Sequence, residues 1–329
     1  MKQNVRNHQS VVSFHSMMLE MLFDKICSFS GWTCIKSAMQ CQMDAIRSKF
    51  CQEIMSTLIT IVSVFWSHFF PSIYATVSVI LNLILHFFPS IYATVSVFWS
   101  PFLVKGIQLD ESKGINHNTL YLDTPNEKWA TELDMIDIVV FNNGHWFVQK
   151  AIYYGEGNQL LGCNFAQEIN CTDYNIFDAF RKVLRTSLKE VTKRFYKSDK
   201  TVVVATFTLA HFEGEWKFGT CLKTEPYKEG DAEMPHLENE MRKLAIEEAA
   251  RAVKDVKEMN GRLRIEALDV TKLTFLRPDG HPGPYMFPNP FANGIKEGVP
   301  NDCVHWCMPG RIDTWNAILL ELMKKWKDE

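Results

Sequence analysis

An aspartate and a histidine three residues apart near the C-terminus could carry out acid–base chemistry. They are Asp302 and His305, in the stretch Asn301–Asn316, which reads NDCVHWCMPGRIDTWN. At this spacing a carboxylate can reach the imidazole Nδ1 within one helical turn or a tight loop, which leaves Nε2 facing a cleft. That arrangement is the base and orienting half of a nucleophilic triad. The alternative is that Asp302 caps the last helix and His305 is a packing residue.

Other blocks of the sequence resemble those of a known family. In chain order they are FWSPFLVKG, LYLDTPNEKWA, DIVVFNNGHWF, HFEGEWKFGTCLKTEP and LRPDGHPGPYM, at 98–106, 120–130, 137–147, 211–226 and 276–286. With the Asp302–His305 pair and the two cysteines that bracket the histidine, Cys303 and Cys307, these blocks resemble the plant trichome birefringence-like family. Members of that family are PC-esterase, or SGNH-type, polysaccharide O-acetyltransferases. The likeness covers about Pro89–Glu329.

The resemblance implies an acyl transfer in which His305 is the general base and Asp302 is its partner. An acetyl group would move onto a plant cell-wall polysaccharide, either a hemicellulose such as xyloglucan or xylan, or pectin, through an acyl-serine intermediate. The resemblance also puts the 142–145 loop near the oxyanion, where Asn143 or Gly144 would donate a hydrogen bond. For Gly144 the alternative is that it only lets the strand end turn sharply.

The nucleophile that this chemistry needs is not recognisable. The family carries it in a Gly-Asp-Ser motif, and that tripeptide occurs nowhere in this sequence. Only Gly31 precedes Gly106, so the upstream part also lacks the glycine of a tight strand-to-helix elbow. Loss of a triad member typically costs several orders of magnitude in rate. We therefore keep two alternatives to the transferase: a non-catalytic, glycan-binding or truncated relative, and a polysaccharide esterase of the same fold.

Four side chains with rings are candidates for the substrate side of the site: His145, Trp146, His281 and Trp306. Carbohydrate sites favour aromatic platforms with a polar rim. For both tryptophans the alternative is packing in the core. For His281, which glycines and prolines flank, the alternative is a rigid loop.

Composition predicts one sizeable globular domain and excludes some function classes. The chain has 329 residues, of which 47% are hydrophobic and 22% charged. A net charge of -3 provides no basic footprint for nucleic acid. No spacing indicates a metal site, and no glycine-rich loop for phosphate occurs, so we expect no bound cofactor. The reaction would still need an acetyl donor, and the oligomeric state is open.

Nine cysteines favour an oxidising compartment, although reduced packing cysteines are the alternative. The family resemblance pairs Cys303 with Cys221, which would pin the Asp302–His305 loop. Cys163 and Cys171 are candidates for a local bridge. Cys307 would then be unpaired or joined to one of the four cysteines between residues 27 and 51.

A glycosylation sequon points the same way. Asn170-Cys171-Thr172 is an acceptor for N-glycosylation, which is added in the secretory pathway. Together with the resemblance, this predicts a glycoprotein of the Golgi lumen.

The N-terminal part divides into an unassigned segment at 1–53 and an apolar segment at 54–97. The sequence HFFPSIYATVSV occurs twice, at His68–Val79 and His86–Val97. Two copies cannot form a repeat core, so we interpret them as a recent duplication or an artefact of gene prediction. A membrane anchor is one alternative. For the second copy we prefer a buried strand over ATVSVFWS, which would feed a turn at FLVKG. The acyltransferase-like domain would cover 98–329.

Helices and strands alternate after Gly106. Short apolar runs predict strands, and apolar residues at helical spacing predict helices. The strands are Met135–Phe141, Thr201–Phe207 and Leu263–Leu268, and the helices cover Ile176–Phe195, Leu237–Val256 and Ile312–Leu322. This alternation predicts an α/β fold with a doubly wound sheet. The resemblance implies an SGNH-hydrolase-like, three-layer α/β/α fold with a mostly parallel central sheet, whose N-terminal part is incomplete.

Overall fold

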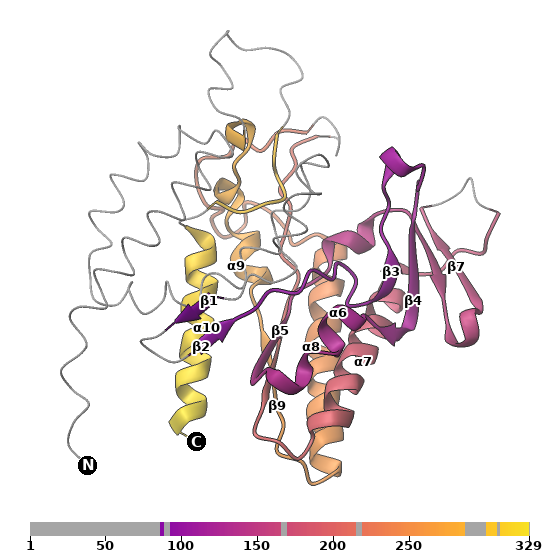
Figure 1. Cartoon of the computed structure of the whole chain (residues 1–329). Coiled ribbons are helices and arrows are strands. Elements are labelled where there is room, and N and C mark those ends of the chain that lie inside the picture. Colours follow the sequence, from indigo (N-terminus) through magenta and orange to yellow (C-terminus); the bar gives the residue numbers. More distant parts are fainter. Residues whose placement is uncertain are drawn as a thin grey trace. The chain divides into compact units, whose positions relative to one another are not determined.

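A computed structural model of the chain describes residues 86–88, 93–165, 170–214, 219–286, 301–307 and 310–328 (Figure 1). The chain forms two compact units, which we describe separately. The α/β unit comprises 98–209 and 228–276, and the C-terminal unit comprises 210–227, 277–329 and the chain up to Val97. The predicted segment 1–53 and the first copy of the repeat lie outside the described residues. The predicted domain boundaries stay predictions.

A three-stranded parallel sheet lies in the α/β unit. Its strands are β5 (Ile138–Phe141), β8 (Thr201–Ala205) and β9 (Arg264–Leu268), in the order β5-β8-β9. Every residue of β8 is buried, as expected for a central strand with both faces covered. The α/β class and these three strands are therefore confirmed. The predicted first strand was too long, because Leu133–Met135 forms a 3-10 turn before it.

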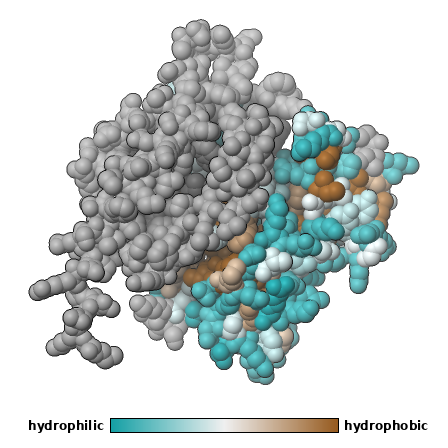
Figure 2. Space-filling view, viewed as in Figure 1, coloured by the Kyte–Doolittle hydropathy of each residue, from teal (hydrophilic) through white to brown (hydrophobic). Residues whose placement is uncertain are grey.

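Two long helices lie side by side in the same unit (Figure 1). They are α7 (Ile176–Phe195) and α8 (His236–Glu258), and both are confirmed at or near their predicted bounds. Asn175 caps α7, because its side chain accepts a hydrogen bond from the amide of Phe177 at 2.8 Å. The apolar face of α7 packs on β4, and α8 packs on β9 and β8. In Figure 2, hydrophilic residues predominate on the visible side of these helices.

A second, mixed sheet was not predicted. It contains β3 (Val104–Ile107), β4 (Asn118–Pro125), β6 (Ala151–Tyr154) and β7 (Leu160–Asn164) in the order β3-β4-β6-β7, and only β4 and β6 are parallel. The turn predicted at FLVKG is confirmed at its start, because the structure has a turn at Pro101 and Phe102 in which the amide of Leu103 donates to the carbonyl of Ser100 at 3.2 Å. The last three residues of FLVKG belong to β3 instead. The carbonyl of Leu103 accepts a hydrogen bond from Trp129 Nε1 at 2.7 Å.

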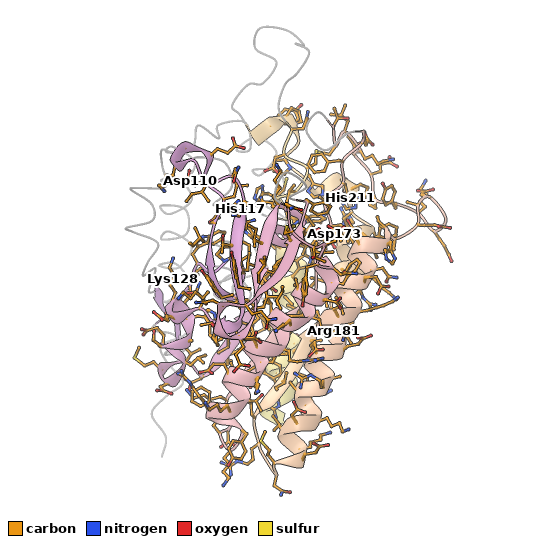
Figure 3. The ribbon with its side chains drawn as sticks, turned by 90° about the vertical axis from the view of Figure 1, so that its right-hand side faces the viewer. Asp110, His117, Lys128, Asp173, Arg181 and His211 are labelled. Atoms are coloured by element: carbon orange, nitrogen blue, oxygen red, sulfur yellow. A yellow bond between two sulfur atoms is a disulfide. The ribbon has the colours of Figure 1, made fainter. Side chains whose placement is uncertain are left out.

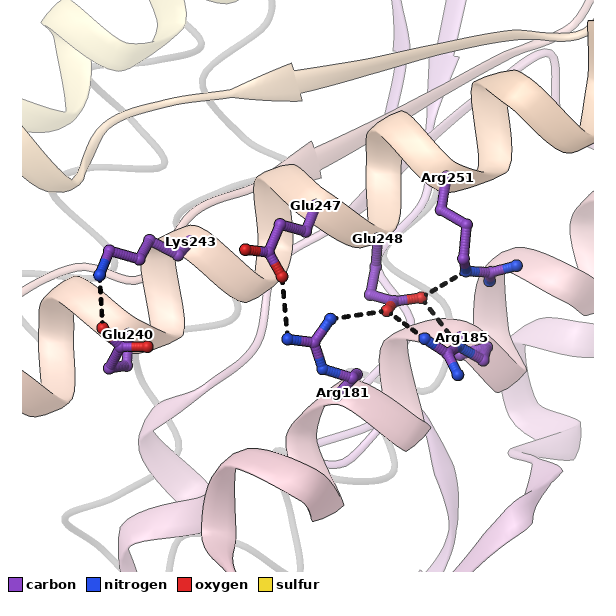
Figure 4. A network of polar contacts seen from close by, with 7 residues as sticks. All are labelled: Arg181, Arg185, Glu240, Lys243, Glu247, Glu248 and Arg251. Atoms are coloured by element: carbon purple, nitrogen blue, oxygen red, sulfur yellow. Dashed lines mark hydrogen bonds and ion pairs between the residues drawn. The ribbon is translucent and has the colours of Figure 1, made fainter.

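A buried glutamate joins α7 to α8 (Figure 4). Glu248 on α8 is 1% exposed and accepts hydrogen bonds from Arg181 at 3.2 Å, Arg185 at 2.6 and 3.1 Å, and Arg251 at 2.8 Å. Arg181 and Arg185 project from α7 (Figure 3 labels Arg181). Burial alone would raise the pKa of Glu248, but its hydrogen bonds to the arginines outweigh burial and lower it. The carboxylate is therefore charged in the folded protein at neutral pH.

Short elements complete the described residues. In the α/β unit they are α6 (Glu127–Ala130), α9 (Thr271–Phe275) and 3-10 turns at Glu111–Lys113, His145–Val148 and Glu156–Asn158. In the C-terminal unit they are β1 (His86–Phe88), β2 (Ala93–Val95) and 3-10 turns at Pro278–Gly280 and Pro284–Met286. The strand predicted over ATVSVFWS is therefore shorter than expected, and it pairs antiparallel with β1.

The helix α10 (Arg311–Asp328) ends the C-terminal unit. Ile312, Trp315 and Leu319 are buried, which confirms the predicted inward face. Among the described helices, none combines the length and the apolar character needed to cross a bilayer.

Candidate functional site

Asp302 and His305 are in contact in the C-terminal unit. Nδ1 of His305 lies 2.9 Å from Oδ2 and 3.0 Å from Oδ1 of Asp302. Oδ1 also accepts hydrogen bonds from the backbone amides of His305, at 2.9 Å, and Val304, at 3.2 Å. The carboxylate therefore orients the imidazole and closes the turn that carries it. The local contact predicted from the three-residue spacing is confirmed.

The surroundings of Asp302 keep its carboxylate charged. The side chain is 7% exposed, and burial alone would raise its pKa. The hydrogen bonds from His305 and from the backbone outweigh burial, so the net shift lowers the pKa of Asp302. A charged carboxylate at Nδ1 is the partner that a general-base histidine requires, because it stabilises the imidazolium formed when Nε2 takes a proton.

A second loop holds the turn in place. Gly283 and Asp302 exchange two backbone hydrogen bonds, at 2.9 and 3.0 Å, and Cys307 donates one to the carbonyl of Gly280 at 2.9 Å. The loop itself is anchored by Asp279, which is 8% exposed. It accepts hydrogen bonds from Arg277, at 2.7 and 2.8 Å, and from Arg311 at the start of α10. These contacts fix the 277–283 loop to the turn and to the last helix.

Both predicted disulfides are present. Cys221 is bonded to Cys303, directly beside Asp302, and Cys163 is bonded to Cys171. Cys307 has no disulfide partner among the described residues, and the four cysteines before residue 52 lie outside them. Burial, and then the charges of Asp302 and Asp279, raise the pKa of Cys307 to about 12. A thiol with this pKa is a weak nucleophile at neutral pH.

Two predicted substrate-side residues lie close to the pair. His281 is 9% exposed and Trp306 is 5% exposed, and their ring centroids lie 4.3 Å apart. Trp306 also meets Trp315 edge to face at 5.5 Å. Nδ1 of His281 lies 2.7 Å from the carbonyl oxygen of His305, and its Nε2 lies 2.8 Å from Nδ1 of His211. The rings of His281 and Trp306 are thus buried against other residues of the protein. Their roles in binding substrate stay predictions.

The predicted oxyanion residues lie in the α/β unit, directly after β5. Gly144 has φ of 147°, a conformation that favours glycine, and a Cβ there would lie 2.5 Å from the ring of Phe207. Gly144 is therefore needed for the close approach of the backbone to that ring. The buried Nδ2 of Asn143 has no hydrogen-bond partner among the described residues, so Asn143 carries an unused donor.

The next two residues of this loop pack inward. Nε2 of His145 lies 3.1 Å from Oγ1 of Thr208, which follows β8, and the ring stacks near Phe207 at 4.5 Å. Trp146 is buried and meets Trp99 edge to face at 5.8 Å. The loop thus joins the carboxyl ends of two neighbouring parallel strands, where ligands bind in open α/β sheets. A substrate-side role for either residue stays a prediction.

Two further predictions concern the surface and metals. Asn170 is exposed, as a glycosylation acceptor must be. Its glycosylation stays a prediction. Within the described ranges no group of three His, Cys, Asp or Glu side chains is placed to hold a metal ion.

Two contacts were not predicted from the sequence, that of His211 with His281 and that of Asp279 with Arg311. His211 and Asp279 lie in segments noted for other reasons, and His211 is 70 residues from His281 in the chain. No spacing rule links residues so far apart, so only the folded chain could reveal the contact.

Comparison with known proteins agrees with the geometry. The family model PC-Esterase, described as a GDSL/SGNH-like acyl-esterase family found in Pmr5 and Cas1p, matches residues 38–322. The chain is 50% identical to xyloglucan O-acetyltransferase 1 of Populus trichocarpa over 235 residues, which are 70% of this chain and 54% of that protein. It is 46% identical to xyloglucan O-acetyltransferase 1 of Arabidopsis thaliana over 232 residues, which are 70% of this chain and 52% of that protein.

A third relative has a different kind of name. The Arabidopsis thaliana protein trichome birefringence-like 25 is 39% identical over 233 residues, which are 68% of this chain and 50% of that protein. The chain thus spans about half the length of the curated relatives it matches. The family model matches more than half of the chain, so the chain belongs to the PC-Esterase family.

Proposed function

We propose that this chain provides the base half of an acyl-transfer site that O-acetylates a plant cell-wall polysaccharide. The observation that carries the proposal is the contact of Nδ1 of His305 with both carboxylate oxygens of Asp302. Relatives named xyloglucan O-acetyltransferases support xyloglucan as the first substrate to test. Xylan and pectin are the next candidates.

The proposed chemistry has two acyl-transfer steps. In the first, Nε2 of His305 takes the proton of a serine hydroxyl while the serine oxygen bonds to the acetyl carbon of the donor. The leaving group then takes that proton from the imidazolium. In the second, Nε2 takes the proton of a sugar hydroxyl, the sugar oxygen bonds to the acetyl carbon, and the serine oxygen leaves and is reprotonated. Asp302 stays charged and stabilises the imidazolium in both steps.

Each tetrahedral intermediate carries an oxyanion that needs donors. We propose Asn143 as one of them, because its buried Nδ2 has no partner among the described residues. The backbone amide of Gly144 is the other candidate. The β5-β8-β9 sheet with α7 and α8 is consistent with part of a three-layer, SGNH-hydrolase-like fold.

The source of the serine separates this proposal from a second candidate function. No Gly-Asp-Ser tripeptide, in which the family resemblance would place the nucleophilic serine, occurs in the sequence. That absence favours a non-catalytic relative that binds glycan without turnover. In that protein, the Asp302–His305 contact would remain as a structural feature of the family.

We further propose that the protein works in the Golgi lumen, as a glycoprotein modified at Asn170. Two disulfides and an exposed sequon asparagine support an oxidising, lumenal compartment. Expression of the wild type and of Asn170→Gln in plant cells tests the glycosylation. We expect only the wild type to carry added mass that an endoglycosidase removes.

An acetyl-transfer assay tests the main proposal. The full chain is incubated with p-nitrophenyl acetate as the donor and xyloglucan oligosaccharides as acceptors, and the oligosaccharides are weighed by mass spectrometry. We expect acetylated oligosaccharide with the wild type and none with His305→Gln. Acetate release without acetylated sugar would instead indicate an esterase. Retention of the chain on a xyloglucan column without turnover would identify the second candidate. Parallel assays with xylan and pectin oligosaccharides identify the acceptor.

A further inference from the structure

Both backbone polar groups of His305 are held by side chains. Its amide donates to Oδ1 of Asp302 at 2.9 Å, and its carbonyl oxygen lies 2.7 Å from Nδ1 of His281. The imidazole of His305 contacts Asp302 as well. The peptide that carries the imidazole is therefore fixed on both sides, by one residue inside the turn and one from the 277–283 loop.

The contact with the carbonyl defines where His281 carries its proton. A carbonyl oxygen only accepts, so Nδ1 of His281 must be the donor. Burial of the ring, and then the neighbouring His211, lower the pKa of His281 to about 4, against the opposing effect of its bond to His305. At neutral pH the ring is uncharged, so Nε2 carries a lone pair and must accept.

The acceptor nitrogen of His281 meets His211. Nδ1 of His211 lies 2.8 Å from Nε2 of His281. Since Nε2 accepts, Nδ1 of His211 donates. His211 follows β8 in the chain (Figure 3 labels it), and its backbone amide donates to the carbonyl of Cys303 at 3.0 Å. The hydrogen bonds thus run in one direction, from His211 through His281 to the carbonyl of His305.

We propose that His281 is a positioning residue for His305: its Nδ1-protonated imidazole holds the carbonyl of His305, and His211 donates a hydrogen bond to the Nε2 that this tautomer leaves bare. The role in catalysis rests on the proposed function, in which His305 is the base. The tautomer of His281 and its hydrogen bond to the carbonyl of His305 can be tested in the folded chain without substrate, whatever its activity. A misplaced base would lower kcat and leave the affinity for substrate unchanged, because its orientation affects the chemical step.

The competing interpretation is that His281 only fills space between Trp306 and the loop. The ring centroids of the two residues lie 4.3 Å apart, so the ring does pack against the indole. If packing were its whole role, an apolar residue of similar size would serve as well. A donor placed near Nδ1 separates the two interpretations. Asparagine presents its amide Nδ2–H close to the position of Nδ1, whereas leucine presents no donor.

Nitrogen NMR of the full chain labelled with 15N-histidine tests the proposal without any substrate. Spectra are recorded from pH 4 to pH 8, and signals are assigned by comparing wild type with His281→Asn, His281→Leu, His211→Asn and His211→Leu. His117→Asn, which changes a histidine in the α/β unit, is the matched control. The groups near His281 that can titrate with it are His211, His305 and Asp302.

We expect His281 to be protonated at Nδ1 and bare at Nε2 from pH 6 to pH 8. His281→Leu should change the Nδ1 proton signal of His305, and His281→Asn should restore it. His211→Asn keeps a donor for Nε2 of His281 and should leave the nitrogen signal of that Nε2 unchanged, whereas His211→Leu removes the donor and should shift the signal. A proton on Nε2 of His281, or a His305 signal that is unchanged in His281→Leu, would overturn the proposal. If His281→Leu does not fold, the two His211 variants decide.

Kinetics provide an independent readout. We expect kcat for acetyl transfer to fall about 10- to 100-fold in His281→Leu, with KM within about twofold of wild type, and most of the loss to be recovered in His281→Asn. Equal kcat in the leucine and wild-type chains would overturn the positioning role. A chain with the expected spectra but no acetyl transfer would refute the proposed function and leave the tautomer assignment intact.

Discussion

The carboxylate of Asp302 contacts the imidazole of His305 through both of its oxygens while Oδ1 also accepts two backbone amides. One side chain thus performs two tasks, closing the turn and orienting the base. Substitution can separate these tasks, because an amide keeps an oxygen acceptor for the backbone but has no charge.

Replacing Asp302 should therefore affect stability and turnover differently. Asp302→Ala leaves two backbone donors unpaired and should lower the free energy of unfolding by about 2 to 4 kcal/mol, with Asp302→Asn losing less than half of that. Asp302→Asn should still reduce acyl transfer by about 10³- to 10⁴-fold. Urea unfolding and p-nitrophenyl acetate turnover measure the two effects. Asp110→Asn, at an exposed ion pair with Lys113, is the control. Equal unfolding of the alanine and asparagine variants would contradict the double role.

Lowering the pH should destabilise the protein through His281. Its folded pKa of about 4 lies below the ordinary value of 6.5, so the unfolded chain binds more protons between these values. The contribution of this group is complete above about pH 6.5 and is lost as pH falls towards 4, up to about 3 kcal/mol. Urea unfolding at pH 4.5 and pH 7 in wild type and His281→Asn measures it. An equal pH dependence in both chains would show that burial of His281 is not its source.

The two disulfides should differ in their contributions. The Cys221–Cys303 bond closes a loop with a sequence separation of 82 residues, and the Cys163–Cys171 bond one of 8. In the chain-entropy model, the long loop stabilises the folded state by about 4.5 kcal/mol and the short loop by about 2.5 kcal/mol. Unfolding of the two double-alanine variants, compared with wild type without reductant, should show that order. The reverse order would mean that loop entropy does not dominate.

The buried carboxylate of Glu248 should stabilise the packing of α7 on α8 (Figure 4). Glu248→Gln retains the shape but loses the charge that three arginines share, and we expect a loss of about 2 to 4 kcal/mol at pH 7. Because the folded pKa is lowered, this contribution is present above the ordinary pKa and is lost as pH falls below it. Wild type and variant should therefore converge in acid. Glu258→Gln, at an exposed pair with Lys254, is the control.

Gly144 should tolerate no Cβ. Both Gly144 and Gly114 have positive φ, but only Gly144 faces a ring, since a Cβ on Gly144 would lie 2.5 Å from Phe207. Gly114→Ala should cost about 1 kcal/mol from its backbone conformation alone. Gly144→Ala should cost about 2 to 4 kcal/mol, because overlap adds to the same backbone cost. Equal losses in urea unfolding would mean that the loop after β5 relaxes freely around Phe207.

Local patterns in the sequence determined several parts of this protein. The Asp302–His305 contact was predicted from a spacing of three residues, because residues this close in the chain meet in any single turn. The helix α7 spans the residues that its apolar periodicity predicted, because one face must be buried. The strands β5 and β8 were found because they are short runs of mostly apolar residues, and β9 was found from its apolar residues Ile265, Ala267 and Leu268, although Arg264 and Glu266 alternate with them.

Only the tertiary structure decided the contacts between distant residues. The mixed sheet pairs β3 antiparallel to β4 across a reversal of the chain, and no periodicity encodes which strands pair. His211 and His281 are 70 residues apart, and their hydrogen bond depends on how two loops meet. The protonation of His281 depends on burial and on an acceptor in a third segment. Sequence provided the ionisable groups, and folding set their neighbours, which determine the charge and direction of each hydrogen bond.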